Sequence, residues 1–383
     1  MLRTSLGLRI PDGMHDILPD EIALQDHAEA EVLKLFNSWS YQKAVTPTLE
    51  YGACIQPVEG EADSFFKFFD RQGHVLVLRP ELTTPIARMV STRMRGEELP
   101  LRLCYAADVF RYSKSPTQEF RQAGVELIGS ESPVADAEVV ALAVEALRHM
   151  EVKDFQINLG HMGIFTGIMD ELGIPLEVKM KYQDALAHKD FVGIERLVEE
   201  SQLTSRVREI LLQLPHLHGK EEMLDQVLEW SAQPSILSAV EALRRVYQYL
   251  KDFGVQDYVS LDLGILRGFS YYTGAVFEGY VPGVGFPIVE GGRYDSLYEE
   301  FGYPLPATGF AINLGALVRR LPIHKVQGAE ALVYGNDTSK VIDQTRKLRQ
   351  TGIQVEMCLD FLTQEEAEDL ALRKGIQSII CAQ

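Results

Sequence analysis

Hydrophobic and polar positions alternate between helical and strand-like spacing in the first part of the chain. From Ile22 to Trp39, apolar residues recur every three or four positions, which predicts an amphipathic helix. Two β-prone runs, 65–69 and 74–78, flank the turn-forming sequence Asp-Arg-Gln-Gly and predict a pair of strands. The sequence Thr83-Thr84-Pro85 then suits a helix start, with a hydroxyl cap ahead of a proline.

The middle of the chain changes from strand-like to helical character. Runs 101–113 and 121–130 predict two strands that are separated by a polar loop. From about 174 to 254, strand signals vanish and charged amphipathic helices follow one another. We interpret this region as a helical insertion into a sheet domain, which resumes at Val259.

The stretch Leu261–Glu278, LDLGILRGFSYYTGAVFE, has two strand-like halves around a glycine-rich turn, which predicts a hairpin at the centre of a sheet. Arg267 is the only charged residue between its two ends, and a buried guanidinium needs partners. One interpretation is an internal ion pair that holds two strands together. The other is a ligand pocket in which Arg267 binds an anion and Tyr271 or Tyr272 forms an aromatic wall.

The C-terminal part has a pattern of its own. Residues 322–328 look like a linker, and from Ala329 onward the pattern is β-α-β-α-β, which predicts a small parallel sheet. We therefore expect two domains, a sheet domain over 1–323 with its insertion at about 174–254, and an α/β unit over 329–383.

Composition narrows the class of protein. The chain has 383 residues, 46% of them hydrophobic and 24% charged, as in soluble globular proteins. It lacks a secretory signal and any apolar run of the roughly 20 residues that a membrane span needs, so we expect a cytoplasmic protein without membrane contact. Four dispersed cysteines favour free thiols, and no spacing typical of a metal or cofactor site is present, so we expect neither.

Net charge argues against one class of partner. With 55 acidic and 37 basic residues, the formal charge is −18, which repels a phosphate backbone at long range. No Lys/Arg-rich segment with interleaved aromatic residues offsets it. We therefore do not expect tRNA or another nucleic acid as a partner.

Six segments occur in the order of a known family. They are GLRIPDGMHDILPDE, TPTLE, LRPELTTPIAR, VFRYS with FRQAGVELIG, LRGFSYYTGAVFE, and EGGRYDSL with PATGFAINLGAL. Over about residues 8–320 the chain resembles class II aminoacyl-tRNA synthetases of the histidyl type. This resemblance implies an α+β fold, a mostly antiparallel sheet flanked by helices, and a homodimer built partly on TPTLE.

The resemblance also implies a pocket for L-histidine. Acids suit an ammonium, arginines a carboxylate, and an acid with a phenol suits an imidazole. Glu81, Thr83 and Gln122 would bind the α-amino group; Arg267 with Gln122 would bind the carboxylate; Glu126 and Tyr272 would bind the imidazole; Tyr294, Tyr271 and Arg111 complete the candidate set. Phe269-Ser270 departs from the Leu-Asp of the family.

The ATP half of the synthetase site is altered. Ser113 replaces the glutamate of motif 2, whose short loop carries Glu119, and Ala316 replaces the arginine of motif 3. An arginine at the motif 3 position stabilises the phosphate transition state, so we predict that its loss abolishes adenylation. The C-terminal unit resembles an anticodon-binding domain that stops at its third strand.

A synthetase-like chain with these losses resembles the regulatory subunits of ATP phosphoribosyltransferase. That family implies a non-catalytic subunit in a hetero-oligomer with a short-form catalytic subunit, in the first step of histidine biosynthesis, with histidine as feedback effector. One alternative is a divergent histidyl-tRNA synthetase or another amino-acid-adenylating relative. Another is a structural scaffold without a ligand, in which the pocket residues are only buried polar groups.

Overall fold

The structure is a computed structural model, and its contacts divide the chain into two compact units, Met1–Pro322 and Ile323–Gln383. The residues that it describes are 8–55, 65–112, 117–201, 203–265, 272–321 and 328–382.

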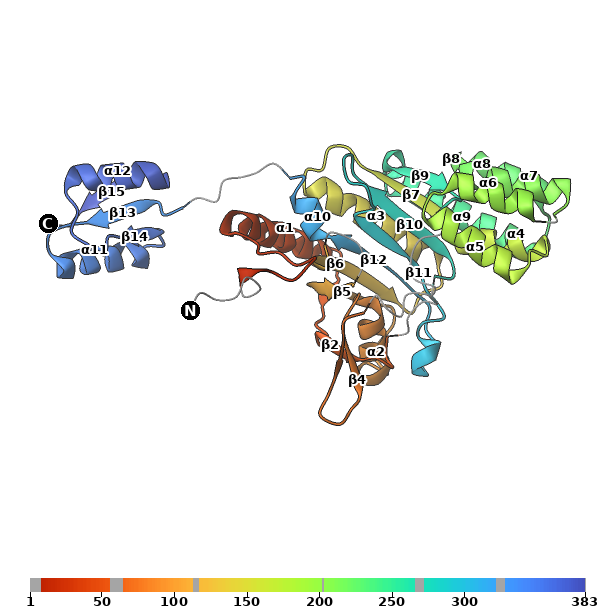
Figure 1. Cartoon of the computed structure of the whole chain (residues 1–383), viewed down its shortest axis with the longest axis horizontal. Helices are drawn as coiled ribbons and strands as arrows, with labels where there is room; N and C mark the ends of the chain where they lie inside the picture. Colours follow the sequence, from red (N-terminus) through yellow and green to blue (C-terminus); the bar gives the residue numbers. More distant parts are fainter. Residues whose placement is uncertain are drawn as a thin grey trace. The chain divides into compact units, whose positions relative to one another are not determined.

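A nine-stranded sheet forms the centre of the first unit (Figure 1). Neighbouring strands run antiparallel except at the pairs β1–β5 and β7–β9, which are parallel. The predicted fold class, a mostly antiparallel sheet flanked by helices, is confirmed. In spatial order the strands are β1 (Gln42–Lys43), β5 (Leu101–Phe110), β6 (Glu119–Ile128), β12 (Ala307–Asn313), β11 (Val289–Arg293), β10 (Ala275–Tyr280), β7 (Gln156–His161), β9 (Val259–Asp262) and β8 (His218–Gly219).

The predicted hairpin over 261–278 is wrong. Its two strand-like halves form β9 and β10, but β7 lies between them and pairs parallel with β9 and antiparallel with β10. The turn-like sequence predicts that β10 lies next to β9, but β7, a strand from a distant part of the chain, occupies that position. Arg267 and Tyr271 fall within 266–271, outside the described residues.

The two faces of the sheet pack against different helices. Ala123, Val125 and Leu127 alternate along β6 and join a large core with α1 (Pro19–Ser38) and α3 (Pro133–His149). The other face packs against Leu82 and the buried side of α2 (Thr83–Arg93), which with 3-10 helix η4 (Glu299–Phe301) encloses a second core. This second face of β6 carries Gln122, Gly124 and Glu126.

The helices of the predicted insertion share the large core. In α9 (Pro234–Asp252), buried residues such as Ile236, Val240 and Leu243 recur at helical spacing, and this helix packs on α3 and on α4 (Met162–Glu171). The region is therefore fastened to the sheet through apolar packing. Its other helices are α5 (Leu176–Ala187), α6 (Phe191–Glu200), α7 (Ser205–Gln213), α8 (Met223–Trp230) and the 3-10 helix η2 (Leu214–His216). The helix α4 precedes the predicted insertion, and the 3-10 helix η3 (Gln256–Tyr258) follows it.

A small antiparallel sheet precedes α2, in the order β2 (Leu49–Tyr51), β4 (Val75–Leu78) and β3 (Lys67–Phe69). The predicted strands around the Asp70 turn are confirmed, and the Asp70 carboxylate accepts hydrogen bonds from the backbone N–H groups of Gln72 and His74 at 2.8 and 2.9 Å. Buried Glu50 of β2 forms a two-point ion pair with Arg88, which ties this sheet to α2. Because this ion pair fixes the small sheet against α2, residues 79–83 between them have a defined position on the second face of the large sheet.

The second unit has the predicted β-α-β-α-β order around a parallel sheet in which β13 is central. A capping box at Thr363 and Glu366 starts its last helix, and Gly375 in the left-handed conformation ends it. Its elements are β13 (Ala331–Tyr334), α11 (Thr338–Gln350), β14 (Val355–Met357), α12 (Gln364–Lys374) and β15 (Ser378–Cys381). Across the described parts of both units, no helix has the length and apolar character to span a membrane.

Candidate functional site

Glycines hollow the second face of the large sheet. Gly124, Gly292 and Gly309 lie on β6, β11 and β12, and Gly309 is paired with both Gly292 and Glu126. A Cβ atom at Gly124 would lie 2.5 Å from the Tyr105 hydroxyl, and one at Gly292 would lie 2.9 Å from the Tyr272 ring. A Cβ atom at Gly309 would overlap the Glu126 carboxyl group. The absence of side chains at these positions makes room for polar groups above the sheet.

Glu126 lies at the bottom of this hollow and is only 1% exposed. The Thr83 hydroxyl donates a hydrogen bond to its Oε1 at 2.8 Å, and the Tyr294 hydroxyl donates to its Oε2. Burial raises the pKa of Glu126 to about 8, although both hydrogen bonds oppose the shift, and the nearby Glu81 charge adds to it. The carboxyl group therefore holds a proton at neutral pH.

Glu81, two residues before helix α2, caps the start of this helix with its side chain. The sequence predicts a threonine cap, but the residue before the helix is Leu82, and no side chain of that residue caps it. Instead the buried Glu81 carboxylate accepts from the backbone N–H of Thr84, at 3.0 and 3.2 Å to its two oxygens. Because Glu81 satisfies the helix start, the Thr83 hydroxyl is left to bind Glu126.

Gln122 and Arg111 lie at the opposite end of the hollow. Gln122 is 5% exposed, and its Oε1 atom has no hydrogen-bond partner, which is costly for a buried acceptor. The Nε of Arg111 donates to the backbone oxygen of Pro80 at 2.9 Å, and its guanidinium lies 5.4 Å from the centre of the Phe120 ring. This end therefore combines a fixed cation with an acceptor that lacks a donor.

Two tyrosines form further walls. Burial raises the pKa of Tyr272 and of Tyr105 well above 10, and the charges of neighbouring glutamates raise both further, so the two phenols keep their protons. Tyr272 follows the undescribed segment directly, and its ring packs on Gly292. Sequence reasoning missed Tyr105, which belongs to no quoted motif. Its only signal is the alternation of β5, which directs it to the same face as Gly124 across the strand pair.

These side chains enclose a small cavity with about 20 Å³ of space for water centres, which is enough for roughly one water. Of the predicted residues, Glu81, Thr83, Arg111, Gln122, Tyr272 and Tyr294 line it, and Glu126 is bonded to two of them. Arg267 and Tyr271 lie outside the described residues. The lining residues that were not predicted are Tyr105, Glu290, Gly309, Phe310 and Ala311.

A second, larger cavity of about 590 Å³ adjoins the first, and Arg111, Gln122, Glu290 and Ala311 line both. It lies between α1, the β5–β6 pair and α10 (Leu314–Val318). Carboxylates outnumber cations on its walls. The carboxylates are those of Glu21, Asp26, Asp108, Glu119 and Glu290, and the guanidinium groups are those of Arg111, Arg121 and Arg319.

The cations of this larger cavity are largely occupied. Arg121 pairs with Glu29 at 2.7 Å and with Asp108 at 3.1 Å, and Arg319 lies 3.8 Å from Glu21. Ala316, the residue at the position of the motif 3 arginine, is part of the wall. Such a surface is poorly suited to a triphosphate. Within the described residues, no group of three or more His, Cys, Asp or Glu side chains could hold a metal ion.

Comparisons with known proteins agree with this fold. The histidyl-tRNA synthetase family model matches residues 13–317. An ATP phosphoribosyltransferase regulatory subunit of Desulfitobacterium hafniense (strain DSM 10664 / DCB-2) is 73% identical over the full length of both chains, and one of Moorella thermoacetica is 41% identical over 98% of each. A solved structure from Bacillus halodurans C, described as an ATP phosphoribosyltransferase regulatory subunit/histidyl-tRNA synthetase, is 31% identical, covers 98% of each chain and has a TM-score of 0.87. Histidyl-tRNA synthetase from Nostoc sp. PCC 7120, at 21% identity and a TM-score of 0.81, shares the fold.

Proposed function

The chain belongs to the family of ATP phosphoribosyltransferase regulatory subunits, and from that premise we propose that it binds L-histidine beside Glu126 and regulates a separate, short-form catalytic subunit. In this proposal it catalyses no reaction itself and acts in the first step of histidine biosynthesis as the sensor of the end product.

One observation carries the proposal, namely that the polar groups that line the small cavity, together with Glu126 behind Thr83 and Tyr294, complement the two ends of histidine. At one end, protonated Glu126 and the Tyr272 phenol suit an imidazole, which has one nitrogen donor and one nitrogen acceptor. At the other, the unpaired Oε1 of Gln122 and the Glu81 carboxylate suit the three N–H donors of an α-ammonium group. Arg111 supplies a cation for the carboxylate.

The size of the cavity supports a regulatory role. With room for roughly one water, it is too small for an amino acid unless its walls move. Histidine would therefore favour an opened arrangement, and its differential affinity for the two arrangements would bias the assembly with the catalytic subunit. Coupling between two such sites is typically about 1–3 kcal/mol.

The neighbouring cavity supports the absence of adenylation. Its excess of carboxylates repels a triphosphate, and its guanidinium groups largely face other acids. The alternative function, a histidyl-tRNA synthetase or another adenylating enzyme, requires positive charge at this position. Measurable formation of histidyl adenylate by the purified protein would favour that alternative and contradict our proposal.

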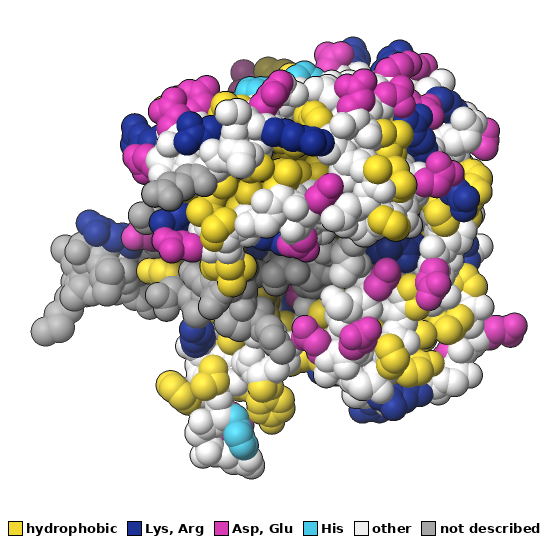
Figure 2. All heavy atoms as spheres, turned by 90° about the vertical axis from the view of Figure 1, so that its right-hand side faces the viewer, with side chains coloured by type: hydrophobic (Ala, Val, Ile, Leu, Met, Phe, Trp, Pro, Cys, Tyr) yellow, Lys and Arg dark blue, Asp and Glu magenta, His cyan; other side chains and the backbone are white. Residues whose placement is uncertain are grey.

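Charge and surface residues support the remaining parts of the proposal. Net charge is −18, and Figure 2 shows acidic and basic side chains interspersed over the face that it presents, so we propose a cytoplasmic subunit that does not bind tRNA. Leu49, Tyr51 and Phe68 are exposed on one face of the small sheet, in and beside the TPTLE segment. These apolar side chains support a homodimer contact within the hetero-oligomer.

The decisive experiment mixes the chain with the short-form catalytic subunit. We expect the two to co-purify, phosphoribosyl transfer to rise on mixing, and histidine to suppress the rise. Buffer exchange to remove histidine should restore the activity, which controls for irreversible inactivation. No rise in activity at any ratio of the two subunits would exclude the regulatory role.

We expect the affinity for histidine to be highest between about pH 6.5 and pH 8. In the complex, Glu126 and the imidazole share one proton. With its pKa at about 8, free Glu126 supplies this proton, while free imidazole is neutral above its ordinary pKa of about 6.5. Binding must therefore release a proton below about pH 6.5 and take one up above about pH 8, and the affinity falls in both directions.

Calorimetric titrations with histidine in buffers of different ionisation enthalpy measure this proton exchange. We expect release on the acid side, uptake on the alkaline side and almost no exchange near pH 7. The tyrosines that face Glu126 should not mask the effect, because burial keeps the pKa of Tyr105, Tyr272 and Tyr298 above 10. An affinity that stays constant from pH 6 to pH 9 would contradict the role of Glu126.

A further inference from the structure

The end of strand β11 is held by an arginine that points away from the small cavity. Gly292 and Tyr294 face the cavity, so Arg293 between them faces the opposite side of the strand. Gly292 packs under the Tyr272 ring, and Tyr294 bonds to Glu126. The position of β11 here thus determines where two walls of the imidazole end lie.

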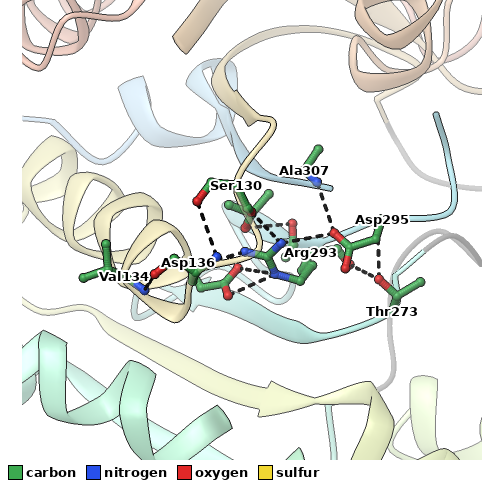
Figure 3. Close-up of polar contacts among 10 residues, drawn as sticks. Ser130, Val134, Asp136, Thr273, Arg293, Asp295 and Ala307 are labelled. Carbon is green, nitrogen blue, oxygen red and sulfur yellow. Dashed lines mark hydrogen bonds and ion pairs between the residues drawn. The ribbon is translucent and has the colours of Figure 1, made fainter. Parts of the chain in front are cut away.

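Arg293 is buried and uses most of its donors (Figure 3). Its Nε lies 3.1 Å from both carboxylate oxygens of Asp136, in the first turn of α3. Its Nη1 donates to the backbone oxygen of Ser130 at 2.9 Å and to Asp295 at 3.1 Å. One planar side chain therefore ties the end of β11 to the start of α3 and to the following turn.

The same cluster also fixes the residues next to Tyr272. The backbone N–H of Thr273 donates to the backbone oxygen of Arg293 at 2.8 Å, and the Thr273 hydroxyl accepts from the backbone N–H of Asp295 at 3.1 Å. Gly274 leaves space for the Arg293 stem, because a Cβ there would lie 2.8 Å from the Arg293 Cδ. The carboxylate of Asp295 also accepts from the backbone N–H of Ala307, which fastens β12.

We propose that Arg293 is a positioning residue for the histidine site, which acts without touching the ligand by holding Tyr272 and Tyr294 through Asp136, Asp295 and Thr273. This inference rests on the proposed function for its ligand. The Tyr294–Glu126 hydrogen bond that Arg293 would position is present without histidine, so the role of Arg293 can be tested without the ligand.

Arg293→Lys is the most informative variant because it keeps the positive charge. A lysine ammonium cannot reproduce the fork that reaches Asp136, Asp295 and Ser130 together, so the strand end loosens while the local charge is preserved. The matched control is Arg102→Lys. Arg102 also joins the sheet to α3, through a two-point pair with Glu138 at 2.8 and 2.9 Å, but it does not line either cavity.

The first measurement is a pH titration of the Glu126 carboxyl group in histidine-free protein, monitored by carboxyl NMR. The signal of Glu126 is assigned as the one that is missing from the spectrum of Glu126→Gln. The Tyr294 hydrogen bond lowers the pKa of Glu126, so a weakened bond should raise it. We expect Arg293→Lys to move this titration to higher pH and Arg102→Lys to leave it in place. An unchanged titration in folded Arg293→Lys protein would overturn the proposal.

The second measurement is histidine affinity. We expect Arg293→Lys to weaken histidine binding about tenfold or more and Arg102→Lys to leave it unchanged. If wild-type protein binds no histidine, the proposed function fails, while the carboxyl titration still decides the role of Arg293. Should Arg293→Lys not fold, the double variant Asp136→Asn/Arg293→Met removes both buried charges and allows the same measurements, with the same expected directions and the same contradicting result.

Discussion

Gly309→Ala is expected to destabilise the first unit and abolish histidine binding. The added methyl group would overlap the Glu126 carboxyl group and the backbone oxygen of Val125 on the adjacent strand. Side chains can turn away from a clash, but a paired strand cannot move without loss of its hydrogen bonds. Overpacking typically costs about 1–3 kcal/mol, and a backbone obstacle puts this variant at the upper end. The urea midpoint and a histidine titration measure the two effects.

Gly315→Ala is the matched control for this substitution. It lies six residues further along, in α10, and a Cβ there would have only one neighbour, the Asn313 carboxamide oxygen at 3.7 Å. We expect its stability and histidine affinity to equal those of the wild type or to rise slightly, because alanine favours a helix over glycine. If both variants behaved alike, the hollow in the sheet would not depend on Gly309.

The second large effect is expected from Glu126→Ala, which should weaken histidine binding by about two orders of magnitude. A hydrogen bond to a charged group contributes about 1.5–3 kcal/mol, and this truncation also leaves the hydroxyls of Thr83 and Tyr294 without their acceptor. Glu126→Gln should retain part of the affinity, because an amide can still accept from one hydroxyl. It carries no titrating proton, so the decline of affinity above pH 8 should disappear. Calorimetric titration at several pH values measures both changes.

Glu126 also links stability to pH in the absence of ligand. Its pKa is about 8 in the folded chain and ordinary, near 4.5, in the unfolded chain. The folded state then binds more protons between these values, so its stability should fall as pH rises from about 4.5 to 8. In Glu126→Gln this part of the decline should be absent, whereas in Glu119→Gln, a control from the same strand, it should persist. An identical pH profile for all three proteins would exclude a protonated Glu126.

The residues around Glu126 show how much of the site could be predicted. Glu81, Thr83 and Glu126 belong to segments whose order along the chain carries the family resemblance, so their residue types predict an amino-acid pocket. Their mutual arrangement could not be predicted. The cap of α2 shows this, because a carboxylate two residues before Thr83 binds the helix start and frees the threonine hydroxyl.

Two other features were beyond local sequence reasoning. Tyr105 lies in a strand with no motif, and only the pairing of β5 with β6 brings it over Gly124. The central hairpin was predicted wrongly because turn-forming residues report local backbone preference, whereas β7 takes its place through pairing with a distant segment. In both cases long-range strand pairing decided the outcome.

The position of β7 between β9 and β10 also has a consequence for how the chain is made. During synthesis β7 emerges roughly a hundred residues before either of its neighbours, with the whole helical region still to follow. Until then an apolar strand, with Ile157 and Leu159 destined for the core, has two unpaired edges. The nascent chain therefore passes through a stage prone to aggregation, which ends only after α9, the insertion helix that packs on α3, and then β9 and β10 have been made.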